Sequence, residues 1–126
     1  MLARWVLVGS MLAFGFVGVT FFVAPAAMAR LVDVSLESAT ADNDVRAVYG
    51  GVALGLACFL AAALRRRAWT EPALWIVALT LAFMALARFV SWAVAGPPTP
   101  LGYWLHAAEF VGSLAALIAL RSYGRR

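Results

Sequence analysis

Four ionisable side chains lie inside long apolar stretches of this sequence, and they are the groups best suited to chemistry. They are Arg46, Arg88, His106 and Glu109. A charge within a membrane span is costly, so it usually marks a binding site, a proton path or an ion pair. Guanidinium, imidazole and carboxylate groups could bind an anion, transfer a proton or hold two helices in register.

Arg88 and Glu109 are expected to contact each other. Arg88 lies seven residues before one apolar stretch ends at Ala95, and Glu109 lies eight residues after the next begins at Leu101. At about 1.5 Å per residue, both lie roughly 10–12 Å from the same end of two neighbouring helices. Arginine can hold a carboxylate with two parallel hydrogen bonds, which suits a dry site.

Further polar groups lie near the end of the predicted helices at which Arg88 and Glu109 lie, which we call the outer end. His106 lies three residues before Glu109, on the same helical face. Arg46 stands near the start of another stretch, with Tyr49 three residues beyond it. We therefore expect a ligand-binding pocket in the outer half of the bundle, with this lining: Arg46, Tyr49, Arg88, His106 and Glu109.

The charge of that set suggests its ligand. With His106 neutral, two arginines outweigh one glutamate and leave a net charge of +1. Arginine binds carboxylates and phosphates bidentately, so an anionic headgroup is favoured. The inner half of the spans is almost wholly apolar, and it would accept the tail of an amphipathic, lipid-like molecule.

Two other interpretations remain open. In one, the protein is an accessory or assembly subunit of a larger membrane complex, or a homo-oligomer, and Arg88–Glu109 is only a structural clamp. Arg46 then extends to the headgroups, and His106 satisfies a carbonyl. In the other, a membrane enzyme uses Glu109 and His106 as acid and base.

Several kinds of chemistry lack their residues. No P-loop, dinucleotide fingerprint or H-E-x-x-H motif is present, and His106 with Glu109 falls short of the three or four ligands of a zinc site. Neither a metal nor another cofactor is therefore expected. Ser91, Ser113 and Cys58 have no evident base, so catalysis is not favoured. The basic residues follow no nucleic-acid-binding pattern, and no nucleic acid partner is expected.

The composition indicates a membrane protein. The chain has 126 residues, of which 65% are hydrophobic, and its mean hydropathy is +0.92. Soluble domains are roughly 45–50% apolar, and a chain this short has little interior in which to bury more. The partner of most of this surface is therefore the lipid bilayer.

Four stretches are long enough to cross a bilayer, which takes about 20 residues. They run over residues 5–24, 45–64, 72–95 and 101–120. Pro72 suits a first helical turn, and Gly96-Pro97-Pro98 ends the third stretch. The sequence predicts an all-α fold, a four-helix transmembrane bundle, in one membrane domain over residues 1–126.

Small residues should let the helices approach closely. Structural roles are expected for Gly50, Gly51 and Gly55, of which the last two form a small-xxx-small pair. In the outer loop, residues 25–44, the alternation over residues 32–37 suits a strand, whereas Met28, Leu31 and Val32 suit a short surface helix. Thr40 or Asp42 is expected to cap the second span.

The arginines set the orientation. Arg4, the run Arg65–Arg67 and the tail residues Arg121, Arg125 and Arg126 lie at alternate span ends, which should be cytoplasmic by the positive-inside rule. Both termini are then inside. The N-terminus also resembles a secretory signal with Ala27-Met28-Ala29 as its cleavage site, but its apolar run exceeds the usual 7–15 residues. A multi-pass protein of the bacterial cytoplasmic membrane is expected.

Two motifs resemble a known family. The string from Asp44 to Gly51, D-V-R-A-V-Y-G-G, precedes Ala87-Arg88-Phe89-Val90-Ser91 and the intramembrane Glu109. Over residues 40–120 the chain resembles small bacterial four-helix membrane proteins of unknown function, and more loosely the DoxX-like group. The resemblance implies four helices and no particular activity. It marks as family features Arg46, Tyr49, Gly50, Gly51, Arg88 and Glu109.

The orientation can be tested by cysteine accessibility. Cysteines placed at Leu36 and Thr99 should react with an impermeant thiol reagent added outside the cell, and a cysteine at Arg67 should not, because Arg67 belongs to a cytoplasmic loop. Labelling of the first two from the cytoplasmic side, or of the third from outside, would contradict the predicted topology.

Overall fold

The structure is a computed structural model that describes residues 1–124, so the predicted cytoplasmic charges of Arg125 and Arg126 lie outside the described residues. The described chain is helical and contains no strand, which confirms the all-α fold. Its helices are α1 Leu2–Val23, α2 Pro25–Leu31, α3 Ala39–Val45, the π-helical η1 Arg46–Gly51, α4 Val52–Ala63, the 3₁₀ turn η2 Arg67–Trp69, α5 Thr70–Ala95 and α6 Pro100–Tyr123.

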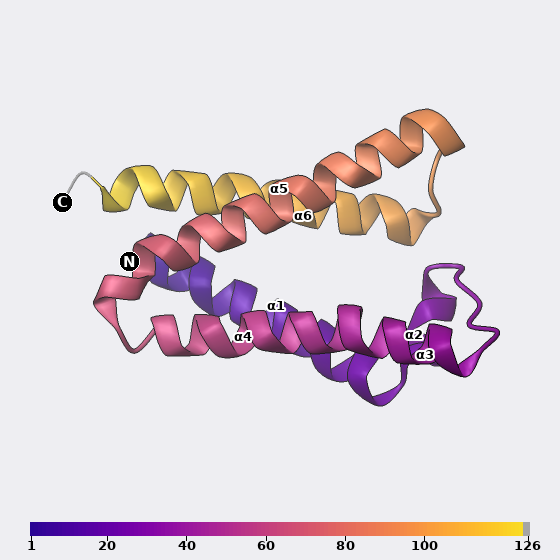
Figure 1. Cartoon of the computed structure of the whole chain (residues 1–126). Coiled ribbons are helices and arrows are strands. Elements are labelled where there is room, and N and C mark those ends of the chain that lie inside the picture. Colours follow the sequence, from indigo (N-terminus) through magenta and orange to yellow (C-terminus); the bar gives the residue numbers. More distant parts are fainter. Residues whose placement is uncertain (125–126) are drawn as a thin grey trace. The chain divides into compact units, whose positions relative to one another are not determined.

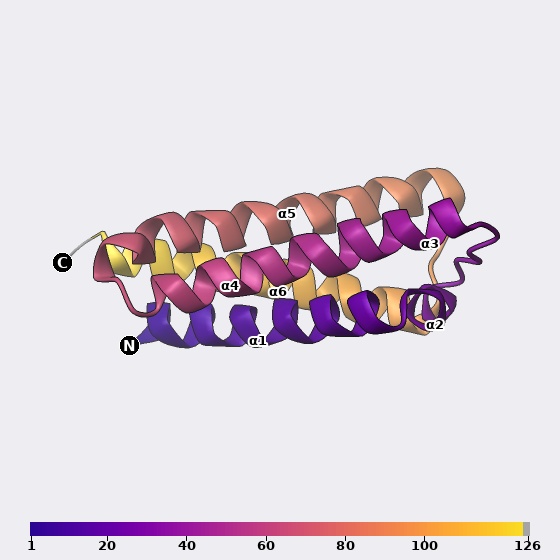
Figure 2. The ribbon, with the colours of Figure 1, turned by 60° about the horizontal axis from the view of Figure 1, so that its bottom comes forward.

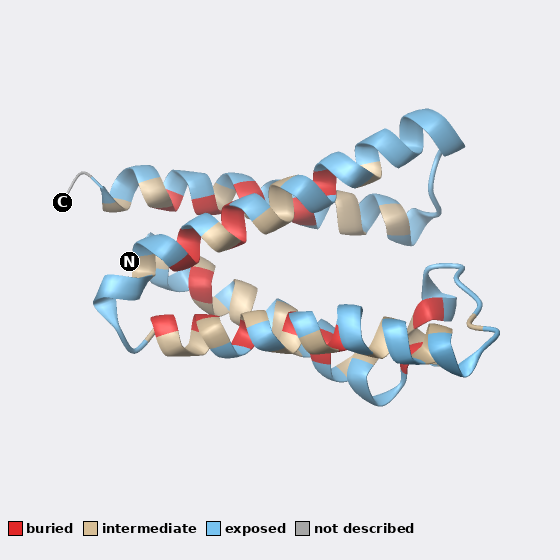
Figure 3. Cartoon of the chain, viewed as in Figure 1, coloured by how far each residue is buried: buried red, intermediate tan, exposed pale blue. Residues whose placement is uncertain are grey.

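Four helical segments of the described chain are long and apolar enough to span a bilayer. Only 17–28% of the most apolar window in each is buried. Figure 3 shows how much of each helix is exposed. In water this apolar exterior would be unfavourable, whereas lipid solvates it, so the chain is a multi-pass membrane protein. The segments are Leu2–Val23, Ala39–Ala63, Arg67–Ala95 and Pro100–Tyr123.

The chain divides into two compact units, which we describe separately. One unit contains Val8–Arg65, and therefore most of α1 together with α2, α3, η1 and α4. The other contains the first seven residues and the chain from Arg66 onward, and therefore η2, α5 and α6.

In the first unit, α1 and α4 run in opposite directions (Figures 1 and 2). Helix α1 approaches α4 closely at Gly18, and it approaches η1 closely at Gly50. A Cβ atom on Gly18 would lie 2.7 Å from the backbone nitrogen of Leu54. A Cβ atom on Gly50 would lie 2.9 Å from both the nitrogen and the Cα of Phe22. No side chain fits at either contact, because the obstructing atoms belong to the opposing backbone.

The close contact therefore differs from the predicted small-xxx-small pair. A Cβ on Gly55 would meet nothing within 4 Å, and one on Gly51 would meet only the carbonyl of Arg46 at 4.0 Å. The spacing of small residues in the sequence shows which of them share a helix face. Which face meets a neighbouring helix depends on how the residues are distributed around the helix axis. Here η1 alters this distribution, because the i→i+5 hydrogen bonds of a π-helical segment rotate the following residues about the helix axis.

The helical segment that contains the second predicted span begins at Ala39, before the predicted start of the span at Val45. Its cap is Ser38, whose hydroxyl accepts a hydrogen bond from the backbone N–H of Ala41 at 3.1 Å, so the prediction that Thr40 or Asp42 caps it is wrong. Asp42 lies in the first turn, where a carboxylate suits the helix dipole. In the loop 25–44, residues Pro25–Leu31 form helix α2, and residues 32–37 form neither a helix nor a strand.

In the second unit, α5 and α6 form an antiparallel hairpin (Figure 1). Helix α5 ends where the sequence predicted, because Gly96 adopts a φ of +95° that favours glycine and the two following prolines cannot continue the helix. Pro100 then opens α6. Along the hairpin, Gly112 leaves room for Leu81, whose Cδ1 would lie 2.7 Å from an added Cβ.

The glycine contacts of the first unit predict a graded effect of adding one methyl group. Gly18→Ala and Gly50→Ala should each destabilise the protein by roughly 1–3 kcal/mol, since the backbones must separate. Gly9→Ala and Gly55→Ala, where a Cβ meets nothing within 4 Å, serve as matched controls and should be neutral or stabilising. Unfolding of the purified protein in mixed SDS micelles measures the difference. Equal effects at all four glycines would contradict the close packing.

Candidate functional site

The predicted contact between Arg88 and Glu109 is present in the α5–α6 hairpin. The Nε of Arg88 donates to both carboxylate oxygens of Glu109, at 2.9 Å to Oε1 and 2.8 Å to Oε2. The glutamate side chain is only 8% exposed, and the arginine side chain is 38% exposed. The pair therefore neutralises a carboxylate that the protein covers almost completely.

The geometry differs from the expected pair of parallel hydrogen bonds. One N–H serves both oxygens, so the two terminal nitrogens of Arg88, Nη1 and Nη2, are not used by Glu109. Within residues 1–124 neither of them makes a hydrogen bond. These nitrogens form the outer edge of the guanidinium, which can bind a second carboxylate or a phosphate with two parallel hydrogen bonds.

Contacts on either side of the Arg88–Glu109 pair fix the register of α5 against α6. Toward the loop, the rings of Trp92 and Tyr103 meet edge to face, with centroids 5.2 Å apart. In the other direction, the buried hydroxyl of Ser113 donates to the carbonyl of Ala78 at 3.1 Å. The sequence analysis considered Ser113 only as a nucleophile and missed this hydrogen bond, although Ser113 lies four residues after Glu109 and hence on the same face.

His106 lies on α6 between these contacts, one turn from Glu109 and one turn from Tyr103. Its Nδ1 atom is buried and has no hydrogen bond in the part of the chain that the structure describes. The expectation that His106 satisfies a carbonyl is therefore not met by this nitrogen. A buried polar atom is stabilised by a hydrogen bond, so this nitrogen can take part in one more polar contact.

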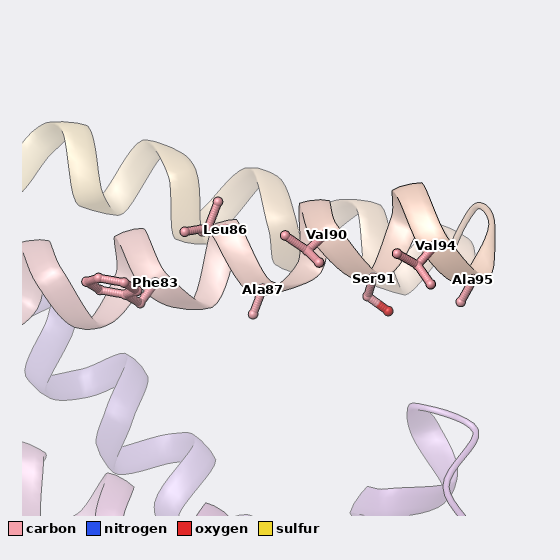
Figure 4. A pocket seen from close by; sticks show the side chains of 7 residues that line it. All are labelled: Phe83, Leu86, Ala87, Val90, Ser91, Val94 and Ala95. Carbon is pink, nitrogen blue, oxygen red and sulfur yellow. The ribbon is translucent and has the colours of Figure 1, made fainter.

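An open, shallow hollow of about 520 Å³ lies along α5, and all of its lining residues belong to this helix. Figure 4 shows its lining along one side of the helix. Arg88 directly follows Ala87 and lies one turn before Ser91, so it stands at the border between the hollow and the face that meets α6. The lining is apolar apart from Ser91, and it comprises Phe83, Leu86, Ala87, Val90, Ser91, Val94 and Ala95.

In the other unit, Arg46 has a different role. Its Nη1 donates to the carbonyl of Phe22, and its Nη2 donates to Oδ2 of Asp42 at 3.0 Å. The last carbonyls of a helix have no partner within it, and Phe22 lies in the last turn of α1. Arg46 therefore caps α1 from the neighbouring helix, and both of its terminal nitrogens are used.

Tyr49 and Gly50 contact the same turn of α1. The ring of Tyr49 stacks on Phe21 with centroids 5.3 Å apart, and Gly50 admits the backbone of Phe22. The predicted motif residues Arg46, Tyr49 and Gly50 thus form, with Phe21 and Phe22, one cluster that we call the α1-end cluster. All three come from η1 (Arg46–Gly51), and π-helical turns often occur at functional sites.

A second carboxylate, that of Asp42, changes the predicted charge of the candidate residues. Asp42 forms an ion pair with Arg46, with side chains 36% and 38% exposed, and sequence reasoning did not include this carboxylate in the set. Each arginine therefore has its own carboxylate, and the expected net charge of +1 disappears. Arg46 and Tyr49 belong to one unit and Arg88, His106 and Glu109 to the other, and their convergence on one pocket stays a prediction.

A scan against protein families then identifies the chain. A family described as a domain of unknown function, DUF4345, matches residues 2–120. The chain belongs to the DUF4345 family. No curated protein and no solved structure is significantly similar to the chain.

The DUF4345 match covers both groups of candidate residues, the α1-end cluster and the hairpin pair. It confirms the predicted membership of a family of unknown function. The looser relation to the DoxX-like group and the family status of the D-x-R-A-x-Y-G-G string stay predictions. Within residues 1–124 of this DUF4345 protein, no three His, Cys, Asp or Glu side chains form a group that could hold a metal ion.

The Arg88–Glu109 pair predicts a strongly non-additive pair of substitutions. Arg88→Met should destabilise the protein by roughly 3 kcal/mol or more, because it leaves a buried carboxylate without a partner. Glu109→Leu should cost less, since the remaining arginine is partly exposed. The double variant should be far more stable than the sum of the two effects implies. Unfolding in mixed SDS micelles gives all three values, and additive effects would contradict a direct contact.

Proposed function

We propose that this protein binds an amphipathic, lipid-like molecule in the membrane, with the polar group of the ligand held by Arg88. The observation that carries the proposal is the free outer edge of the Arg88 guanidinium. Glu109 engages only Nε, and this leaves Nη1 and Nη2 available in a fixed orientation. A residue that served only as a clamp would be expected to use two N–H groups on the carboxylate.

The surroundings of Arg88 suit such a ligand. The hollow against α5 is lined by apolar side chains and would accept an alkyl or isoprenoid chain. Ser91 offers a hydroxyl one turn from Arg88, and the unpartnered Nδ1 of His106 offers a further polar contact on the facing helix. The polar groups are few and close to an apolar wall, as is usual in sites for amphipathic small molecules.

The ligand need not carry a full negative charge. Glu109 already balances Arg88, so the guanidinium acts as an oriented pair of donors. Carboxylate, phosphate and carbonyl oxygens all accept such donors, and an anionic group gives the strongest hydrogen bonds. The same pairing does not favour Glu109 as a general acid or base, because both of its oxygens accept hydrogen bonds from Arg88. We place this binding protein in the cytoplasmic membrane of bacteria, with both termini inside.

Arg88→Lys provides the sharpest test. Lysine keeps a positive charge beside Glu109, but it lacks the paired nitrogens of the guanidinium edge. Lipids and metabolites extracted from the purified wild-type protein should include a molecule that is depleted roughly tenfold or more in Arg88→Lys, as expected when charged hydrogen bonds are lost. Ala87→Phe, which fills the hollow, should deplete the same molecule. Mass spectrometry of the extracts measures the amounts.

Arg30→Lys is the matched control, because it makes the same chemical change at an exposed arginine of the other unit. It should retain the molecule at the wild-type level. If Arg88→Lys retains as much as the wild type, or if the folded wild-type protein carries no bound molecule, the proposal is wrong. The first of these outcomes would favour the accessory-subunit interpretation, in which the pair acts only as a clamp between α5 and α6.

A further inference from the structure

Three arginines lie at the end of the α5–α6 hairpin that carries the start of α5 and the end of α6. Arg66 and Arg67 precede Thr70, the first residue of α5, and Arg121 lies in the last turn of α6. All three side chains are exposed. None of the binding groups near Arg88 belongs to this end. The positive-inside rule accounts for the side of the membrane on which these arginines are expected, but not for the contacts that they make.

Two contacts order this end of the hairpin. The guanidinium carbon of Arg66 lies 4.9 Å from the centre of the Trp69 ring, in a cation–π arrangement. The hydroxyl of Tyr123 donates to the backbone carbonyl of Arg67 at 3.2 Å. This hydrogen bond ties the last turn of α6 to the η2 turn, and it brings Arg121 to the same level as Arg66 and Arg67.

Among the described residues of the unit, nothing fully compensates the positive charge of this end. Its described acidic residues are Glu71 and Glu109, and Glu109 is already paired with Arg88. Glu71 lies in the first turn of α5, and no salt bridge joins it to an arginine within residues 1–124. Three guanidinium groups therefore face a single free carboxylate, which leaves a local excess of positive charge.

Helix length places these arginines at the depth of lipid headgroups. Helix α5 has 26 residues and α6 has 24, so at 1.5 Å per residue they are about 39 Å and 36 Å long. The hydrocarbon core is about 30 Å thick, so the helix ends extend into the headgroup layer. Trp69 and Tyr123 suit that layer, where amphipathic rings concentrate at membrane interfaces.

We infer that this end of the hairpin binds the phosphate of an anionic phospholipid through Arg66, Arg67 and Arg121. Guanidinium groups bind phosphate oxygens bidentately, and the stacking on Trp69 holds one of them in position. A lipid is favoured over a soluble anion because its phosphate is already fixed at the depth of the arginines. This site is independent of the hollow beside Arg88, and either can fail without the other.

Spin-labelled lipids test the inference on the full chain. The protein is reconstituted in phosphatidylcholine nanodiscs that contain a trace of spin-labelled phosphatidylglycerol or phosphatidylcholine, and electron paramagnetic resonance gives their relative association constants. The wild type should prefer phosphatidylglycerol by roughly fivefold or more, as expected for arginines near a charged surface. The variant Arg66→Gln/Arg67→Gln/Arg121→Gln should bring the ratio close to one.

The controls distinguish a specific phosphate-binding site from a general effect of the protein's positive charge. Arg30→Gln removes an exposed arginine elsewhere and should leave the ratio unchanged. Arg121→Gln alone leaves the Arg66–Trp69 contact intact and should lower the ratio in part. This single variant tests the site if the triple variant does not fold. Inorganic phosphate should compete no better than sodium chloride of equal ionic strength. An unchanged ratio in the triple variant, an equal loss in Arg30→Gln, or preferential competition by phosphate would overturn the inference.

Discussion

A charged side chain inside an apolar helix must find a partner, and this constraint determines much of the structure. Glu109 is almost fully covered, so its carboxylate fixes where α6 can lie against α5. Once Arg88 and Glu109 meet, the other contacts of the hairpin fall at consistent levels, from Trp92–Tyr103 at the loop to the hydrogen bond of Ser113. The ion pair thus sets the register in which the remaining side chains pack.

The same constraint is met differently by Arg46. This arginine has a nearby carboxylate, Asp42, one turn before it on the same helix, and a helix end in need of donors, at Phe22. Its charge therefore stabilises the junction of two helices without an acidic residue on the facing helix. The glycine that follows, Gly50, then admits the α1 backbone. A short polar motif is sufficient to hold one helix end, provided that a small residue lies beside it.

The fold was predictable because long apolar stretches and their terminators are local features. Gly96 and the prolines after it end α5 where expected, and equal depth was enough to pair Arg88 with Glu109. The contacts of Arg46 were not predictable, because the carbonyl of Phe22 is a backbone group with no signal in the sequence. The η1 turn also escaped prediction, and it explains why Gly50, and not Gly51 or Gly55, meets the neighbouring helix.

The two intramembrane arginines therefore differ in what remains available for other molecules. Both terminal nitrogens of Arg46 are occupied by groups of its own chain, so its role in stability is complete without a ligand. Arg88 gives only Nε to its partner, and its helical neighbours Ala87 and Ser91 line an apolar hollow. Because a guanidinium is planar, fixing Nε also fixes the direction of the other two nitrogens. The residue that holds the hairpin together therefore keeps two hydrogen-bond donors that the described chain does not use.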